Sequence, residues 1–526
     1  MENDSGTAAQ RSSPPPVSSA AVVRRAGIVA GPVLAFACYL LLPSHYSTGP
    51  GEWADFTQTG RATLAMMVWM ATWWMTEAVD IEVTALMPIV LFPLLGIASI
   101  AKATQPYASD VIYLFMGGFV LGLAIERWGL DKRIAFFTLR LTGTKPAAMT
   151  GGFMVATAFL SMWISNTACA AMMVPIAVSV IDLVLRSGTG KGLRESGGIP
   201  QDRIDERNFA TGLLLCVAYA ASIGGIATVI GSPPNGIAVR FIAQTYKQEV
   251  TFLDWMAIGL PFTLVFLPLA WLMITRVLFP ARLGEVAGGR EMIAAEYAKL
   301  GPLGRGEKVT LSVFAGAAFL WIFGSLLRDV TVAGIQPLKG LTDSGVAMLA
   351  ALALFLLPVD RAKGIRAMNW DTAVKLPWGV LILFGGGLSL AAAVEANGVS
   401  EFIGQSTRGL GVLPPLLLLA AIVTMTVFLS EVTSNTAQVA TMTPVLAAMA
   451  PALGMNPYVL VVVCALGASS AYMMPVGTPP NAIVFGTGLI RMPQMIKAGF
   501  WLNLAGIALI TAMGWLYIPR LLGSAY

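Results

Sequence analysis

The sequence predicts an all-α polytopic membrane protein made of two related halves, and two observations carry this prediction. Of the 526 residues, 56% are hydrophobic and 12% are charged, whereas soluble domains carry roughly twice that charged fraction. The pattern S-x-x-x-S-N-T occurs at residues 161–167 and again at 430–436, each time inside a long apolar stretch. We expect about eleven transmembrane helices plus two re-entrant hairpins, arranged as two inverted-topology repeats.

The duplication extends beyond the seven-residue motif. Asn166 and Asn435 are 269 positions apart, and the same offset relates further glycine, proline and glutamate positions. A fixed offset over a long span indicates a duplicated unit. A second pair of motifs, G-[ST]-P-P-N, occurs at 231–235 and 477–481, where the offset is 246. The first copy therefore carries extra residues between its two motifs.

Composition excludes several classes of function. The net charge of +5 is modest and lies in the loops, where it is typical of an orientation signal rather than of a nucleic-acid surface. The four cysteines lie in apolar runs and there is one histidine, so we expect neither a disulfide framework nor a Cys/His metal site. No phosphate-binding loop of the type G-x-x-x-x-G-K-[ST] occurs. We therefore expect no nucleic-acid partner and no organic cofactor.

The chain divides at proline breaks and basic loops. Residues 1–25 are rich in Ser, Pro and Ala and are expected to form a disordered cytoplasmic tail. The expected units after it are N-terminal helices at 26–110, the first repeat core at 111–280 with a hairpin at 146–185 and a broken helix at 209–243, a cytoplasmic loop at 281–307, further helices at 308–373, and the second repeat core at 374–526 with a hairpin at 412–450 and a broken helix at 458–490.

Basic residues predict the orientation. They flank the first hairpin on both sides, as Lys145 and Arg186 illustrate, but are sparse around the second. Because cytoplasmic loops are enriched in Lys and Arg, the first hairpin should enter from the cytoplasm and the second from outside. This places the N-terminus in the cytoplasm and the C-terminus outside. Inverted repeats with broken helices around a polar site are typical of a secondary transporter.

Each Ser-Asn-Thr motif offers hydroxyl and carboxamide groups, which are costly to bury in a membrane unless a partner satisfies them. One interpretation is that they are packing contacts between helices, where small polar residues are common. The duplication instead favours a polar ligand held between the two copies. Neutral oxygen atoms and carbonyl groups freed by the prolines suit a hard cation such as sodium. Neutral donors at the starts of the following helices suit a carboxylate or another oxyanion.

Neither motif contains a lysine or an arginine, and Glu431 is the only acid within them. An anionic ligand would then be balanced by bound cations and helix dipoles, which gives a physical reason for cation coupling. Hydroxyl and amide groups do not suit proton coupling, which requires a titratable side chain in the site.

With WWMTEA at 73–78 and VTALMP at 83–88, the paired motifs resemble the divalent anion/sodium symporter family of di- and tricarboxylate transporters. The resemblance covers nearly the whole chain after the tail. It implies a homodimer in a bacterial inner membrane, with scaffold helices at 26–110 and 308–373 and an elevator-type transport domain that holds the hairpins. The implied function is sodium-coupled import of a C4-dicarboxylate such as succinate, malate or fumarate.

The resemblance also implies site residues by position. A first sodium site would use Ser161, Ser165, Asn166 and Gly231, and a second would use Ser430, Thr433, Asn435 and Gly477. Thr433 is expected to offer its carbonyl group. The substrate would meet Ser165, Asn166, Thr167, Ser232, Ser434, Asn435, Thr436, Thr478 and Pro479.

Other functions stay open. A sodium-independent dicarboxylate exchanger, or a citrate or sulfate carrier, would use the same fold. An intramembrane enzyme would need acids such as the Glu77, Asp80 and Glu82 group or the repeat-related Glu126 and Glu395. We interpret these acids as caps and interface anchors, because no histidine, nucleophile or metal set accompanies them, and we expect no enzyme. A channel is disfavoured because hairpins around a central site fit alternating access better.

Overall fold

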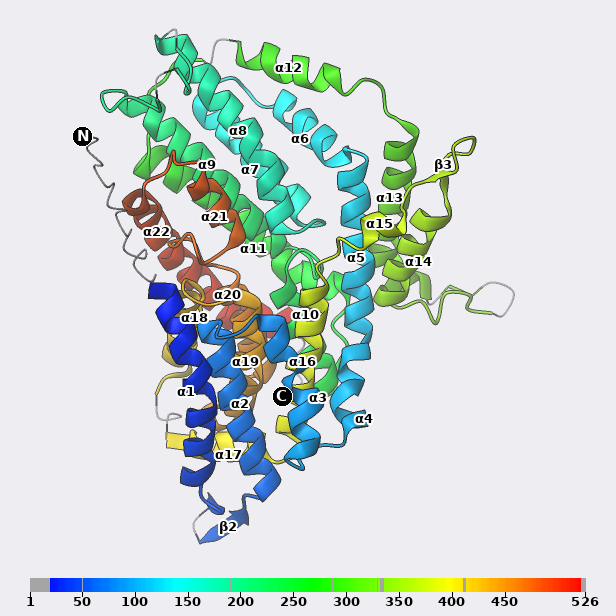
Figure 1. The fold of residues 1–526 in the computed structure, drawn as a ribbon, viewed down its shortest axis with the longest axis vertical. Helices are drawn as coiled ribbons and strands as arrows, with labels where there is room; N and C mark the ends of the chain where they lie inside the picture. Colours follow the sequence, from blue (N-terminus) through cyan, green and yellow to red (C-terminus); the bar gives the residue numbers. More distant parts are fainter. Residues whose placement is uncertain are drawn as a thin grey trace, which may run out of the picture.

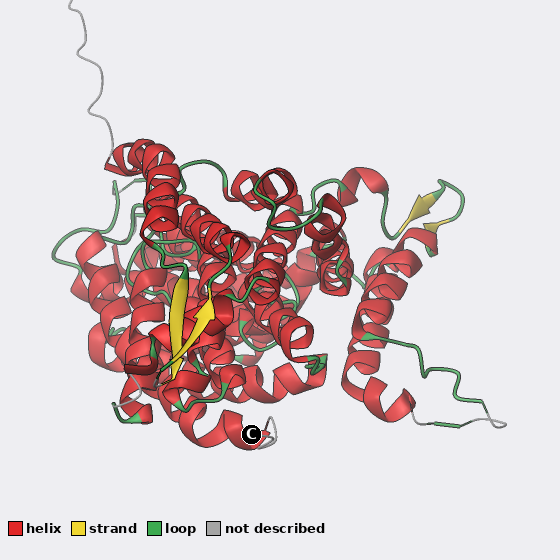
Figure 2. Cartoon of the chain, turned by 90° about the horizontal axis from the view of Figure 1, so that it is seen from below, coloured by secondary structure: helices red, strands yellow, loops and turns green. Residues whose placement is uncertain are grey.

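The computed structural model describes residues 19–49, 51–189, 191–195, 197–285, 288–328, 330–331, 335–409 and 413–521. Helices dominate this part of the chain, and two short antiparallel β-hairpins, β1–β2 and β3–β4, lie at its margins (Figure 2). Eight of the described helices are long and apolar enough to cross a membrane, and five shorter apolar helices accompany them. The prediction of a helical membrane protein is confirmed at this level.

The N-terminal elements are α1 (Ser19–Leu41), β1 (His45–Gly49), β2 (Glu52–Asp55), α2 (Gln58–Thr76), α3 (Ile81–Leu94), α4 (Ile100–Thr104) and η1 (Gln105–Ala108). A first series follows: α5 (Asp110–Arg127), α6 (Leu130–Leu141), α7 (Pro146–Ser161), α8 (Asn166–Thr189), α9 (Ile204–Gly225), α10 (Pro233–Tyr246), α11 (Phe252–Leu272) and η2 (Met273–Leu278).

The middle elements are α12 (Gly289–Lys299), α13 (Arg305–Arg328), α14 (Asp343–Leu356), β3 (Pro358–Asp360), β4 (Ile365–Arg366) and α15 (Trp370–Ala373). A second series completes the chain: α16 (Trp378–Ala396), α17 (Val399–Ser406), α18 (Pro415–Ser430), α19 (Asn435–Met449), η4 (Pro451–Leu453), α20 (Pro457–Ala468), α21 (Pro479–Gly486), α22 (Met492–Ala512), η5 (Met513–Tyr517) and α23 (Ile518–Leu521).

The two series have the same order of elements. Each begins with a long helix and a short helix (α5–α6 and α16–α17), continues with two broken pairs, and ends with a long helix (α11 and α22). Proline begins one or both helices of each pair, because its missing N–H costs nothing in the first turn. In Figure 1, α6 and α12 lie at the top of the molecule, whereas α17 lies near the bottom.

The interior is densest around the first halves of the broken helices. In the most apolar 18-residue stretch of α9, 94% of the residues are buried, compared with 28% in the corresponding stretch of α13. Helices α7 and α8 pack on α9, and α18 and α19 pack on α20. Each broken helix is therefore covered by protein, which is the condition under which a break in a helix is tolerated at membrane depth.

Three features differ from the expectations. Helix α1 begins at Ser19, so residues 19–25 of the expected tail are helical, whereas residues 1–18 lie outside the described chain. Helix α12 lies inside the expected loop at 281–307. The β-hairpins were not expected, because their strands have at most five residues. Val412, where the second hairpin was expected to begin, lies outside the described residues.

Candidate ligand and cation site

The two Ser-Asn-Thr motifs form the breaks of their helix pairs, with the same geometry in each. Ser161 Oγ, at the end of α7, lies 2.6 Å from the Asn166 carboxamide and donates to the carbonyl oxygen of Ala221 in α9 at 2.7 Å. In the second series, Ser430 Oγ lies 2.5 Å from the Asn435 carboxamide and 2.5 Å from the carbonyl oxygen of Ala468 in α20. Each serine thus ties the start of the returning helix to the neighbouring broken helix.

The side-chain amide of Asn166 has an oxygen-rich environment. The atom that faces Ser161 also lies 3.0 Å from the carbonyl oxygen of Ala221 and 3.3 Å from that of Gly231. If this atom is the amide nitrogen, it donates to these oxygen atoms. If it is the carbonyl oxygen, four oxygen atoms converge, which is the environment that a hard cation prefers. Rotation of one amide would therefore convert a hydrogen-bonded cluster into an oxygen cage.

Glycines allow this close approach. A Cβ atom at Gly225 would overlap the Asn166 carboxamide, and one at Gly231 would lie 2.6 Å from the carbonyl oxygen of Gly225. Gly477 has the equivalent position in the second series, where a Cβ atom would lie 3.1 Å from Glu431 Oε2. Gly231 and Gly477 therefore occupy positions that leave little space for a side chain. Sequence reasoning did not identify Gly225, because nothing local distinguishes it from other helical glycines.

A buried asparagine braces each break in the broken helices. Asn235 Nδ2 donates to the carbonyl oxygens of Gly225 (3.0 Å) and Thr228 (2.8 Å). Asn481 Nδ2 donates to those of Ala471 (3.3 Å) and Met474 (3.1 Å), positions shifted by the same 246 residues. Both asparagines are fully buried, and neither Oδ1 atom has a partner in the described chain. The asparagine that ends each G-[ST]-P-P-N motif thus stabilises the loop at the break through its hydrogen bonds. The motif alone did not reveal this role.

Glu431 is a buried carboxylate at the second tip. It accepts hydrogen bonds from three consecutive backbone N–H groups, those of Tyr472 (2.8 Å), Met473 (2.9 Å) and Met474 (2.9 Å), and from Asn503 Nδ2 (2.7 Å). Only 4% of its surface is exposed. All four donors are uncharged, so they satisfy the carboxylate without cancelling its charge. The first series has Met162 at this position, so the negative charge belongs to the second tip alone.

The remaining predicted residues lie around the helix starts. Ser165 Oγ accepts from the N–H group of Ala168 (3.2 Å), and Thr478 Oγ1 accepts from that of Asn481 (3.3 Å). The hydroxyls of Ser232 and Ser434 precede α10 and α19 without capping them. Since the first N–H groups of a helix have no partner within it, such starts can bind an anion.

Exposure differs among the other expected substrate contacts. Thr167 and Pro479 are exposed, and Thr436 is half-buried, like Ser434 and Asn435 beside it.

Thr433, a predicted ligand of the second sodium ion, is buried. Its hydroxyl donates to the carbonyl oxygen of Leu429 (2.9 Å), one helical turn earlier. Its donation leaves lone pairs on the hydroxyl oxygen, so the side chain and the main-chain carbonyl of Thr433 both retain the capacity to bind a cation.

Helices of the two series pack against each other at the site. Helix α8 packs against α21, and α19 packs against α10, so each returning helix touches the broken helix of the other series. The hydroxyl of Tyr219 in α9 also donates to the carbonyl oxygen of Tyr472 at 2.8 Å. No hydrogen bond in the described chain joins the two tips directly. A ligand between them would therefore meet surfaces from both halves.

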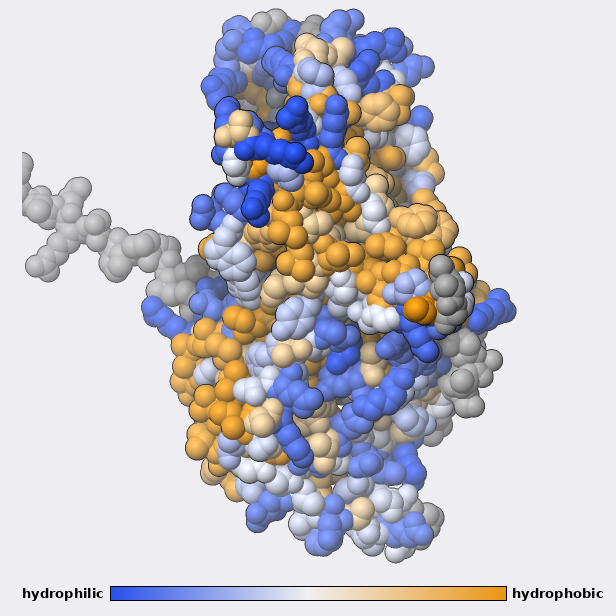
Figure 3. All heavy atoms as spheres, turned by 90° about the vertical axis from the view of Figure 1, so that its right-hand side faces the viewer, coloured by the Kyte–Doolittle hydropathy of each residue, from blue (hydrophilic) through white to orange (hydrophobic). Residues whose placement is uncertain are grey.

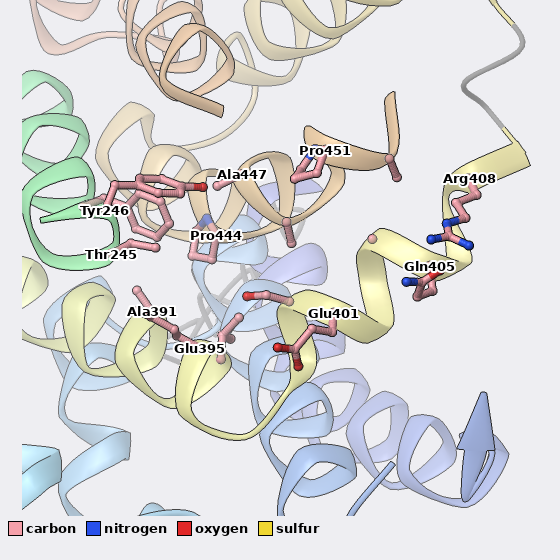
Figure 4. Close-up of a pocket in the computed structure, with 16 residues that line it drawn as sticks. Thr245, Tyr246, Ala391, Glu395, Glu401, Gln405, Arg408, Pro444, Ala447 and Pro451 are labelled. Carbon is pink, nitrogen blue, oxygen red and sulfur yellow. The ribbon is translucent and has the colours of Figure 1, made fainter. Parts of the chain in front are cut away.

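The acids considered for enzyme chemistry lie elsewhere. Glu77 pairs with Arg24 at 2.5 Å, and the described residues contain no group of three His, Cys, Asp or Glu side chains that could hold a metal ion. Glu395 lines a cavity of about 400 Å³ with Glu401, between α10, α16, α17 and α19. Figure 4 shows Thr245 and Tyr246 at one end of this cavity and Arg408 at the other.

Comparisons with known proteins identify the family of this chain. Residues 53–523 match the family model described as the sodium:sulfate symporter transmembrane region. The chain is 37% identical over 498 residues to the sodium-dependent dicarboxylate transporter SdcS of Staphylococcus saprophyticus, covering 94% of this chain and 92% of that protein. It is 36% identical, with the same coverage, to SdcS of Staphylococcus aureus.

A solved structure shares the fold. The YdaH transporter of Alcanivorax borkumensis superposes with a TM-score of 0.58 at 15% identity, covering 94% of this chain and 98% of that one. The family match and the relatives named as transporters identify an integral membrane transporter, not an enzyme. The chain belongs to the sodium:sulfate symporter family, and the family expected from the paired motifs is confirmed.

Proposed function

We propose that this transporter imports a C4-dicarboxylate, such as succinate, malate or fumarate, together with sodium ions. The observation that carries the proposal is the pair of oxygen-rich clusters at Ser161–Asn166 and Ser430–Asn435, which have the same geometry and no basic side chain. The relatives named as sodium-dependent dicarboxylate transporters support both the ion and the substrate class.

The first sodium ion is proposed to bind Ser161, Ser165, Asn166 and the carbonyl of Gly231. The carbonyl of Gly231 and the Asn166 carboxamide already face each other across 3.3 Å. The second ion is proposed to bind Ser430, Asn435 and the carbonyls of Thr433 and Gly477. The charge of Glu431 lies beside this second cluster, which favours a cation there because the interior screens charges poorly.

The substrate is proposed to lie between the tips, held by neutral donors. Its contacts would come from Ser165, Asn166, Thr167, Ser232, Ser434, Asn435, Thr436, Thr478 and Pro479. A lysine at this place would keep its charge after substrate release and would repel the sodium ions. With neutral donors, the bound cations balance the dicarboxylate. Substrate affinity should then rise with sodium concentration, and sodium affinity should rise equally with substrate.

The transport cycle is proposed to be elevator-type alternating access in a homodimer. Scaffold helices at 26–110 and 308–373 would stay fixed while the two repeat cores move together. The matching order of α5–α11 and α16–α22, with α6 and α17 toward opposite ends of Figure 1, supports inverted repeats. We propose a bacterial inner-membrane location, with a cytoplasmic N-terminus and an external C-terminus.

The test is uptake into proteoliposomes of labelled succinate, citrate and sulfate, with and without an inward sodium gradient. We expect succinate uptake that depends on sodium, and its loss in Asn166→Ala and Asn435→Ala. Uptake that is unchanged when choline replaces sodium would refute symport and favour exchange. Sulfate uptake without succinate uptake would move the proposal to the anion in the family's name.

A further inference from the structure

A basic cavity lies away from the two tips. It has a volume of about 590 Å³ and is formed by the start of α13 and by the segment from the end of α14 through the β3–β4 turn. Three cationic side chains line it: Arg305 and Lys308 from α13, and Arg361 from the turn. All three side chains are exposed, so none of them is needed to hold the core together.

These cations have no ionic partner in the described chain. The one acid in the lining, Asp360, accepts from the N–H groups of Ala362 (3.0 Å) and Lys363 (3.2 Å), which closes the β3–β4 turn. Glu307, next to Lys308 in sequence, is paired with Arg133 at 2.5 Å. The cavity therefore has a positive excess that the protein itself does not neutralise.

The surroundings of the cavity are apolar. Val309 and Leu357 contribute to its lining, and Leu311 and Leu356 beside them are 40% and 67% exposed. Further along, α13 and α14 expose more large apolar side chains, namely Phe319, Phe323, Leu349 and Leu352. Figure 3 views this side of the molecule and shows hydrophilic residues bordering a broad hydrophobic area.

We propose that this cavity binds the phosphate headgroup of an anionic phospholipid, with the acyl chains lying along the exposed faces of α13 and α14. Arginine recognises phosphate with two parallel hydrogen bonds, and lysine adds a compact positive charge. A free phosphate ion would use the cations but not the apolar faces. The combination of both is characteristic of lipid headgroup pockets beside membrane helices.

The test compares lipid binding to purified, delipidated protein by native mass spectrometry, with phosphatidylglycerol and phosphatidylcholine as probes. The variant is Arg305→Gln/Lys308→Gln/Arg361→Gln. The control is Arg282→Gln/Arg290→Gln/Lys363→Gln, which removes three exposed positive charges outside the lining. We expect the lining variant to lose phosphatidylglycerol affinity roughly a hundredfold, since three basic residues near the surface contribute about 1 kcal/mol each. We expect the control to bind like wild type.

Equal loss in the control would mean diffuse attraction by net charge and would overturn the proposal, as would full binding by the lining variant. Displacement of the lipid by inorganic phosphate would point to a soluble anion instead. If the triple variant fails to fold, Arg361→Gln alone, on the exposed turn, should still weaken phosphatidylglycerol binding several-fold. An unchanged affinity in that folded variant would also count against the lipid pocket.

Discussion

At the scale of single residues, Glu431 is the group whose chemistry is least expected inside a membrane protein. Its carboxylate is buried, and four neutral N–H groups hold it. Its charge is therefore available to a cation at the neighbouring cluster, while its hydrogen bonds fix the loop that bears Gly477.

Replacing Glu431 with Gln should weaken sodium binding. The amide keeps the shape, but it removes the charge and places a donor against backbone donors. We expect sodium affinity to fall roughly tenfold or more, the size of a lost charged hydrogen bond. Sodium titration of substrate binding to the purified protein measures this. The control is Glu401→Gln, which removes an exposed carboxylate and should leave the sodium titration unchanged.

A second residue-scale prediction concerns pH. Burial raises the pKa of Asp131, near the start of α6, from 3.8 to about 6. The folded protein then binds this proton up to about pH 6, whereas the unfolded chain releases it above about pH 4. Stability should therefore fall as the pH rises from 4 to 6 and stay lower above that, by about 2–3 kcal/mol.

Asp131→Asn should remove this penalty. We expect a higher melting temperature than wild type at pH 7.5 and a difference that shrinks toward pH 5, measured by scanning fluorimetry in detergent. Asp202→Asn, at an exposed position, controls for the change in net charge. A variant that is less stable than wild type at pH 7.5 would show that the hydrogen bond from the Lys132 N–H group to the carboxylate outweighs the cost of burying its charge.

At the scale of elements, the break between α9 and α10 requires glycine at position 225, because a Cβ atom there would not fit. Gly225→Ala would place a Cβ atom against the Asn166 carboxamide, so we expect loss of sodium-dependent substrate binding. Gly212→Ala lies in the same helix, where the new Cβ would be an ordinary 3.5 Å from Ile274. It should bind normally and gain up to about 1 kcal/mol of stability from helix propensity. Equal binding by both variants would contradict the close-packed cluster.

The elements differ in how well local sequence predicts them. Proline at 146 and the polar break at 166 mark the first hairpin, and the observed helices begin there, because proline and caps act on the nearest turn of backbone. Helix α12 was not predicted, because it is short and polar. The partners of Glu431 lie more than 40 positions away, and such contacts depend on how helices pack.

At the scale of the whole molecule, inverted repeats require the two tips to open toward opposite sides of the membrane. Single cysteines at Lys145, Arg186 and Leu413 can test this, because all three positions are exposed. The background should lack Cys38, the one native cysteine that is not buried. We expect a membrane-impermeant maleimide to label the first two positions only in inside-out vesicles and Leu413 only in right-side-out vesicles. Labelling of Lys145 and Arg186 from different sides would rule out the first re-entrant hairpin.

The crossing of α8 onto α21 and of α19 onto α10 also has a consequence for biosynthesis. Helix α9 ends at Gly225 and α21 begins at Pro479. At roughly 5–20 residues per second, a ribosome needs tens of seconds to add the intervening chain. Until then the first tip has its partners in α9 but lacks its contact with α21, so one side of the site stays uncovered. We expect a nascent chain stopped before α20 to be recognised as unfinished and degraded, which would prevent a half-built carrier from leaking ions.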